Sequence, residues 1–493
     1  MPAIISNFGI RTSNLKEPAW LGILLSLLVA GCAVGPDYRR PETPVPQTWA
    51  EVSGSLTAEP VNIARWWTLF DDEQLNNLVD RAVGSNKDLQ LAEARIRQAR
   101  AQRRVTASSA FPTLDASGSY SRAKRSSGFS GFGTGPTSAI GGFVPGGSPV
   151  AFDLFQTGLD ATWEADLFGG VRRAVEAANA DIAASQENLN DVLVTLLGEV
   201  ATNYFQIRGN QRRIEIARQN IETQRQTVEV AQGRFKAGLG SRLEVVQAEA
   251  LLAATESQIP ALDSAVKQSI HQLGVLLGAE PEALLPELSP PKPMPPAPPE
   301  VPVGLPSDLL RRRPDIRRTE RQLAAATARI GVAVADLFPK LSLTGSAGYQ
   351  STKASEFIRP SNEFWSFGPG LSLPIFDGGR IRGNIQVQNA LQEQALITYE
   401  STVLTALQDV ENAIVVYADA KAARDALTRA VDASRQATQI SQNLYQKGLT
   451  DFLNVLQSEA ALYQTEDRLI QNEQQTLTAL VALFKALGGG WEF

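Results

Sequence analysis

Residues 110–120 read Ala-Phe-Pro-Thr-Leu-Asp-Ala-Ser-Gly-Ser-Tyr, and from Pro112 onward apolar and polar side chains alternate one by one. This period of two is typical of a strand with one apolar and one polar face. The preceding segment, from about Asp72 to Ser108, has apolar residues at helical spacing and is expected to form one helix. The sequence therefore predicts that a helix ends at this proline and a strand begins.

The same transition occurs again at residues 337–341, which read Leu-Phe-Pro-Lys-Leu, after a shift of 227 residues. Farther along, the pattern around Gly238-Leu239 recurs around Gly448-Leu449 with a shift of 210 residues. Solenoid periods are only about 20 to 50 residues long, so this repeat indicates a duplicated, domain-sized unit. The predicted organisation is repeat 1 at 66–288, a proline-rich linker at 289–304 and repeat 2 at 305–493.

Four alternating segments of roughly ten residues are expected, two in each repeat, and this is the length that a tilted strand needs to cross a bilayer. They are predicted near residues 113–120, 155–167, 341–350 and 365–375. The polar faces are expected to line a wet lumen with Asp115, Asp160, Glu164 and Asp166. Interfacial girdles are expected from the aromatic residues Phe111, Trp163, Phe168, Phe338, Trp365 and Phe376.

Four strands cannot close a barrel, and a membrane excludes open sheet edges because unpaired backbone groups there are costly. The barrel must therefore be shared between chains. Two chains would supply about eight strands and three about twelve, and both numbers occur in known barrels. The physics of the sequence does not choose between a dimer and a trimer.

Each second strand is expected to lead into a very long helix. The first should run from Gly169 to about Gln232 and the second from Gly378 to about Gln446, neither containing proline. Heptad spacing is kept by Ile207, Ile214, Ile221 and Val228 in the first, and a second stripe contains Val403, Leu407, Val410, Ile414 and Tyr417. At about 1.5 Å per residue, each rod would be about 100 Å long. Turns at 238–240 and 448–450 should lead to return helices ending near Gly278 and Leu487.

The N-terminal region has the pattern of a signal peptide over residues 1–31, with basic residues before an apolar run that is short for a membrane span. The small residues before Cys32 resemble a bacterial lipobox, in which the cysteine carries lipid. The alternative is a chance cysteine after an ordinary signal peptide. Residues 32–65 are expected to be a lipidated, proline-containing extended segment.

Composition argues against several functions. The 46 basic and 52 acidic residues are mixed and give a net charge of −6, so no basic surface for nucleic acid is expected. With one His and one Cys, neither a Cys/His metal site nor a Cys–His nucleophile is expected. His271 is read as a packed or turn-facing residue, and no catalytic residue is predicted. The cluster Arg311–Arg313 with Asp315 suits either an anion site or an ordinary helix start.

Two further alternatives concern partners. The linker's proline run favours a stiff polyproline II spacer, although such runs also bind proline-reading domains. A periplasmic coiled-coil lipoprotein, such as an adaptor or spacer, would explain the heptads and Cys32. It would leave the four bilayer-length strands unexplained, so a membrane channel is preferred.

Four sequence blocks carry a family resemblance: the lipobox with Gly35-Pro36-Asp37-Tyr38, Trp66-Trp67-Thr68-Leu69-Phe70, residues 305–316 and residues 485–491. Together they resemble the outer-membrane efflux lipoproteins, the OprM-like and NodT-like relatives of TolC. The resemblance implies an α+β membrane protein in the outer membrane, a homotrimer whose shared twelve-stranded barrel is continuous with a periplasmic α-helical barrel. It also implies a passive exit duct, joined through a periplasmic adaptor to an inner-membrane efflux pump. No cofactor is implied beyond covalent lipid on Cys32.

The resemblance also assigns roles to the helical turns. Adaptor-docking positions would be Arg234, Gly238, Leu239, Ser241, Tyr445, Gly448, Leu449 and Thr450. A gate one turn beyond would contain Glu244, Gln247, Leu453, Asn454 and Gln457. Gln457 stands where the family commonly has an acidic residue that binds cations, so a weaker cation site is expected and Glu244 is the candidate source of negative charge. A competing interpretation is that both glycines simply end helices.

Overall fold

The structure is a computed structural model that describes residues 33–50, 56–57, 63–124, 151–298 and 301–491. The predicted signal peptide, Cys32 and most of the loop between the first two predicted strands lie outside these residues. The chain divides into two compact units. Unit 1 draws on Met1–Tyr38, Ala101–Asn179 and Ala325–Gln392, and unit 2 on Arg39–Arg100, Ala180–Ala324 and Glu393–Phe493.

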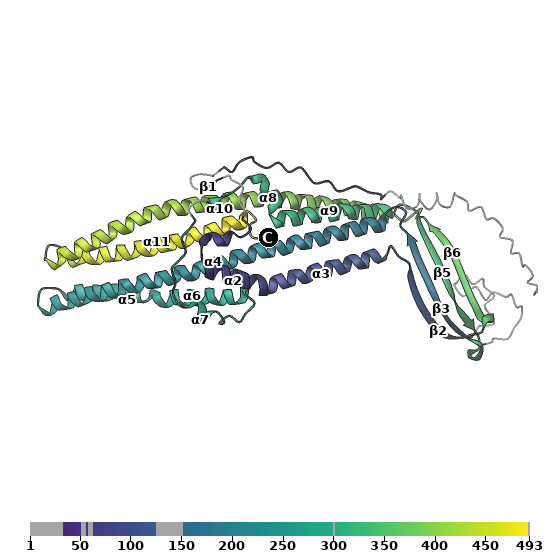
Figure 1. The fold of residues 1–493 in the computed structure, drawn as a ribbon, viewed down its shortest axis with the longest axis horizontal. Helices are drawn as coiled ribbons and strands as arrows, with labels where there is room; N and C mark the ends of the chain where they lie inside the picture. Colours follow the sequence, from purple (N-terminus) through teal and green to yellow (C-terminus); the bar gives the residue numbers. More distant parts are fainter. Residues whose placement is uncertain (1–32, 51–55, 58–62, 125–150, 299–300, 492–493) are drawn as a thin grey trace, which may run out of the picture. The chain divides into compact units, whose positions relative to one another are not determined.

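Both repeats contain a helix, two strands, a long helix and a return helix, in that order (Figure 1). The elements of the first are η1 (Trp66–Phe70), α2 (Glu73–Ser85), α3 (Lys87–Ser108), β2 (Thr113–Lys124), β3 (Ala151–Ala165), α4 (Gly170–Lys236), α5 (Arg242–Glu256), α6 (Gln258–Leu276) and α7 (Leu285–Leu288). Those of the second are α8 (Pro306–Arg312), α9 (Pro314–Ala335), β5 (Lys340–Ser351), β6 (Glu363–Ser372), α10 (Arg380–Gln446) and α11 (Phe452–Ala486). Two short strands, β1 (Leu56–Thr57) and β4 (Val301–Pro302), pair in parallel.

The sheet of unit 1 confirms the four predicted strands. Its order is β2-β3-β5-β6 with every neighbour antiparallel, as Figure 1 shows. The register keeps the two faces separate: Leu114 lies opposite Ala161, Trp163 opposite Leu343, and on the other face Asp115 lies opposite Asp160. Within the single chain β2 is exposed along its whole length, so one chain leaves much of the sheet uncovered.

Two strand ends differ from the prediction. β3 ends at Ala165, and the carboxylate of Asp166 accepts hydrogen bonds from the backbone of Val171 and Arg172 at the start of α4, at 3.1 and 2.9 Å. The assignment of Asp166 to the lumen-lining face was therefore wrong: this residue satisfies free N–H groups of a helix start. β6 ends at Ser372, before Pro374, which lacks the N–H that a ladder requires.

The segment after residue 32 is fixed within unit 1 by backbone and side-chain contacts. The N–H of Val34 donates to the carbonyl of Phe168 at 3.1 Å, and the Arg173 guanidinium donates to the carbonyl of Val34 and the carboxylate of Asp37 at 3.2 and 2.6 Å. Gly35 has φ +93, and a Cβ there would come within 2.4 Å of Gly331. Only glycine allows this approach, which explains the Gly-Pro-Asp block.

The predicted single helix over 72–108 was wrong, because the chain breaks at Asn86. This residue is extended (ψ 136) and almost fully buried. Its side chain donates to the carbonyl of Leu276 at 2.8 Å and accepts from the backbone N–H groups of Asp88 and Leu89 at the start of α3. One asparagine thus ends α2 and caps α3.

The two long helices are confirmed, at 67 residues each. Most of their heptad residues are buried: Ile207, Val410 and Ile414 fully so, whereas Ile214 and Leu407 are partly buried. The return helix of repeat 1 departs from the prediction, because it is interrupted at Ser257 between α5 and α6, whereas α11 runs without a break. Pro260 explains the interruption, since its ring collides with the carbonyl four residues earlier.

Three of the quoted sequence blocks meet in the core of unit 2. Trp66 stacks on Phe484 with ring centroids 5.4 Å apart, and a Cβ on Gly490 would collide with Leu197 at 2.5 Å. The indole N–H of Trp491 donates to the carbonyl of Arg312 at 2.9 Å. The glycines of residues 488–490 therefore allow the chain to pack against the buried tryptophan.

Candidate functional site

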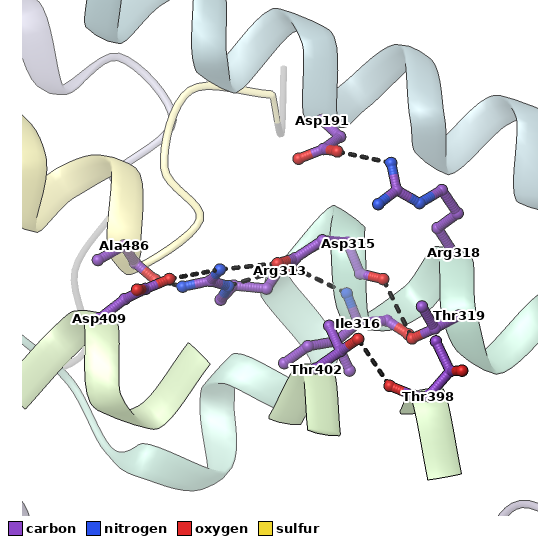
Figure 2. A network of polar contacts seen from close by, with 10 residues as sticks. All are labelled: Asp191, Arg313, Asp315, Ile316, Arg318, Thr319, Thr398, Thr402, Asp409 and Ala486. Atoms are coloured by element: carbon purple, nitrogen blue, oxygen red, sulfur yellow. Dashed lines mark hydrogen bonds and ion pairs between the residues drawn. The ribbon is translucent and has the colours of Figure 1, made fainter. Parts of the chain in front are cut away.

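The anion-site interpretation of residues 311–315 fails on geometry. Arg313 donates to both carboxylate oxygens of Asp315 at 3.0 and 2.7 Å, to Asp409 at 3.0 Å and to the carbonyl of Ala486 at 3.1 Å (Figure 2). Asp315 lies in the first turn of α9. The helix-start interpretation is therefore supported, and four hydrogen bonds of the Arg313 guanidinium go to groups of the protein.

The helical turns of unit 2 form the better candidate. We call α4 with α5 hairpin 1 and α10 with α11 hairpin 2; Figure 1 shows the two helices of each hairpin side by side. In hairpin 1, Leu239 N–H donates to the carbonyl of Arg234 and Gly238 N–H to that of Phe235, at 2.8 and 3.0 Å. Hairpin 2 repeats both bonds at Leu449 and Gly448.

This pair of hydrogen bonds is the Schellman motif, in which the residue after the helix takes a left-handed conformation. Gly238 and Gly448 have φ +72 and +73, so their role in ending helices is supported by the structure. Each turn leaves a leucine, Leu239 or Leu449, 70% exposed. Ser241 then starts α5 with a capping box shared with Glu244, whereas Asp451 at the same place before α11 makes no side-chain cap.

Three of the predicted residues form a polar link between the hairpins. The hydroxyl of Tyr445 in hairpin 2 donates to Oε2 of Glu244 in hairpin 1 at 2.9 Å. The guanidinium of Arg234 lies over the Tyr445 ring, 4.6 Å from its centroid. Burial and the Glu244 carboxylate raise the pKa of Tyr445 to about 12, so the hydroxyl keeps its proton and remains a donor at neutral pH.

An apolar layer lies behind this link. Tyr445 packs against Phe452 with ring centroids 5.1 Å apart. The layer takes residues from all four helices of the two hairpins: Val228, Ala231, Ala248, Tyr445, Phe452, Val455 and Leu456. The two turns of one chain are thus held together by an apolar cluster with one charged hydrogen bond at its edge.

The remaining predicted gate residues are dispersed around this cluster. Leu453, Asn454 and Gln457 are exposed on α11, whereas Glu244 and Gln247 are half-buried on α5. Asn454 donates to Thr450 at 2.8 Å, within hairpin 2. The position that is acidic in repeat 1, Glu244, is therefore bound to the other hairpin, and its neutral counterpart in repeat 2, Asn454, is bound locally.

One residue of this region was missed by the sequence analysis. Glu459 on α11 is 5% exposed and accepts hydrogen bonds from Thr227 of α4 and Gln442 of α10, at 2.7 and 2.9 Å. The repeat did contain the signal, since Glu459 aligns with Glu249, but sequence does not tell which copy is buried. Glu249 is exposed.

The part of the chain that the structure describes lacks two other features, a metal site and an apolar membrane-spanning helix. It contains no group of three or more His, Cys, Asp or Glu side chains arranged to hold a metal ion. No helix among the same residues is both long and apolar enough to cross a bilayer. His271 lies half-buried on α6.

Comparison with known proteins identifies the family. The model of the outer membrane efflux protein family matches residues 78–279 and 305–489. Nodulation protein T of Rhizobium leguminosarum bv. trifolii is 32% identical over 472 residues, covering 94% of this chain and 96% of that protein. The solvent efflux pump outer membrane protein SrpC of Pseudomonas putida is 31% identical, with 94% and 97% covered.

Solved structures agree. The outer-membrane channel OprN superposes with a TM-score of 0.84 at 37% identity, covering 93% of this chain and all of that one. Both repeats, the sheet of four strands and the long helices are thus shared with a known channel. The chain belongs to the outer membrane efflux protein family, whose members are efflux channels, and it is an α+β channel of the outer membrane.

Proposed function

We propose that three copies of this chain pool their sheets into a twelve-stranded outer-membrane barrel and their helices into a periplasmic duct. The duct passively releases small molecules that an inner-membrane pump delivers through a periplasmic adaptor, and it catalyses no reaction. The exposed edges of the four-stranded sheet support pooling, because edges in a bilayer must be paired.

The periplasmic entrance is proposed to be gated by the separation of hairpins 1 and 2. The observation that carries this proposal is the hydrogen bond from Tyr445 to Glu244, which joins the two turns beside an apolar cluster. Farther from the turns, Arg213 pairs with Asp467 at 2.7 Å and Tyr463 donates to Gln258 at 2.6 Å. Opening near the turns then requires the loss of the Tyr445 bond while these distant ties persist.

The adaptor is proposed to dock at the two turns. Leu239 and Leu449 are equivalent, exposed apolar side chains on rigid, glycine-capped turns, which suits repeated contacts around a trimer. Gly238 and Gly448 have open space where a side chain would be, so the turn surface is accessible. Arg234 and Tyr445 support the turns from within.

Glu244 is expected to give the entrance its cation preference. Replacing it by glutamine removes three charges per trimer, while the amide oxygen still accepts the hydrogen bond of Tyr445. We therefore expect Glu244→Gln to lower cation selectivity and weaken block by divalent cations, because a neutral constriction attracts cations less. The reversal potential of single channels in a salt gradient is the measurement.

The matched control is Glu229→Gln, which removes an exposed charge from α4 and leaves the Tyr445 link intact. Its reversal potential should equal that of the wild-type channel. If Glu244→Gln leaves both selectivity and divalent block unchanged, Glu244 is not the source of the acidic character.

Lipid attachment at Cys32 is proposed as a second anchor. Ala33 packs against Gly169 in unit 1, and the hydrogen bonds of Val34 and Asp37 fix the following residues there. A lipid on Cys32 would therefore be attached directly before residues that are fixed in unit 1. We expect Cys32→Ala to lose all label from radioactive palmitate. Trimers should still form, because the barrel itself anchors the protein in the membrane. Persistent label would place the lipid on another residue.

A further inference from the structure

Glu459 is a buried carboxyl group at the meeting point of three helices. Its Oε1 accepts both available hydrogen bonds, from Thr227 Oγ1 and Gln442 Nε2. Its Oε2 is buried, and no group of the described residues forms a hydrogen bond with it. No arginine or lysine in the described residues forms an ion pair with it. The Thr227 bond crosses between the hairpins, whereas the Gln442 bond stays within hairpin 2.

This geometry disfavours the ionised form. A carboxylate spreads its charge over both oxygens, and here one oxygen is buried and receives no hydrogen bond from the described residues. A proton on Oε2 removes that charge while Oε1 keeps both bonds. In agreement, burial raises the pKa of Glu459, and the hydrogen bonds from Thr227 and Gln442 offset this effect only in part.

Charged groups on the packed helices do not neutralise it. On α10 and α11, Arg435 pairs with Glu466 at 2.9 Å, and on α4 and α5, Arg225 pairs with Glu256 at 2.9 Å. Nearer the turns, Arg234 and Glu244 are half-buried and both contact Tyr445 rather than Glu459. The remaining charged residues near this level are exposed: Glu229, Glu249, Asp432, Lys447 and Asp451. The protonation of Glu459 therefore depends more on access of solvent to its carboxyl group than on a neighbouring charge.

We propose that Glu459 is a proton-binding site that couples periplasmic pH to the separation of hairpins 1 and 2. The inference rests on the proposed gate. When the hairpins are together, Oε2 is buried and binds a proton tightly; when α4 moves away from α11, the carboxyl group becomes exposed to solvent and the proton is released. Acid thus stabilises the closed entrance, and this stabilisation is lost as pH rises from the ordinary carboxyl value through the raised one.

The internal duplication supplies a matched control. Glu249 is the equivalent residue of hairpin 1, but it is exposed and accepts from Gln232 of its own hairpin at 3.2 Å. Replacing either glutamate by glutamine removes one carboxyl group, and the two positions are equivalent in the two repeats. A response at Glu459 and none at Glu249 would therefore reflect burial between hairpins.

The test records purified trimers in planar bilayers from about pH 4.5 to about pH 8, a range that starts near the ordinary carboxyl value. If opening weakens proton binding about tenfold, the open-to-closed ratio of the wild type should rise up to about tenfold across the range. Glu459→Gln should remain at the low, acid level at every pH, and Glu249→Gln should titrate like the wild type. Thr227→Val removes a bond that favours the ionised form and should move the midpoint to higher pH.

A second measurement does not depend on conduction. Spin labels at the exposed positions Lys236 and Lys447 report the distance between the turns. We expect it to lengthen with pH in the wild type and not in Glu459→Gln. An unchanged pH response of Glu459→Gln, in conductance or distance, overturns the proton site and leaves the channel function standing. A wild type that conducts at no pH overturns the proposed function, and the label distances still decide on the proton site.

Discussion

Arg313→Gln is expected to lower the free energy of unfolding by about 3 kcal/mol, the lower end of the range for removing one partner of a buried ion pair. The arginine side chain is 11% exposed and binds two carboxylates and the carbonyl of Ala486 (Figure 2). Asp315 contributes most, because it is bidentate and 20% exposed, whereas the Asp409 side chain is 46% exposed and screened by water. Thermal unfolding of the detergent-solubilised channel, followed by circular dichroism, measures the loss.

The neighbouring Arg311→Gln is the control. The Arg311 side chain is 75% exposed and lies 3.7 Å from Asp308, so its loss should cost less than about 1 kcal/mol. Burial would raise the pKa of Asp315, but the hydrogen bonds and charge of Arg313 hold it below its ordinary value. This stabilisation is present above the ordinary carboxyl pKa of about 4 and is lost in stronger acid. Equal unfolding temperatures for the two variants at neutral pH would show that Arg313 does not hold these elements together.

The long helices and the strands could be predicted because their signals are local. Proline-free heptads specify α4 and α10 whatever lies around them, and period-two alternation specifies the sheet faces. The breaks at Asn86 and Ser257 were missed, although Gly84-Ser85-Asn86 and Pro260 are local signals for them. The helical spacing of apolar residues continues across both positions, so each segment was predicted as one uninterrupted helix.

The contacts between the hairpins could not be predicted in the same way. Tyr445 meets Glu244 across about 200 residues of chain, and the rotation of one helix against another follows from packing in three dimensions. The duplication even misleads here, because equivalent positions such as Glu249 and Glu459 have opposite burial. Family resemblance pointed to residues near the turns, but the bonds among these residues depend on packing in three dimensions.

Tyr445→Phe is expected to open the entrance. The substitution removes the hydroxyl and keeps the ring, which still packs on Phe452 and lies beneath Arg234. A hydrogen bond to a charged group contributes about 1.5–3 kcal/mol, so its loss should raise the ratio of open to closed entrances by about 10- to 100-fold. Single-channel recordings of purified trimers measure this ratio as the time spent open against the time spent closed. The free energy of unfolding should change far less than in Arg313→Gln, because the apolar cluster is intact.

Tyr463→Phe is the matched control for this prediction, since the hydroxyl of Tyr463 in hairpin 2 also bonds to repeat 1 but meets the neutral amide of Gln258 at the start of α6. A neutral hydrogen bond contributes only about 0.5–1.5 kcal/mol, so the increase in the open ratio should be smaller. Combining Tyr445→Phe with Glu244→Gln should add little to the opening of Tyr445→Phe alone, because the hydrogen bond between the two side chains is already absent in Tyr445→Phe. If the two tyrosine variants conduct alike, or if Tyr445→Phe conducts like the wild type, the Tyr445–Glu244 bond does not hold the entrance closed.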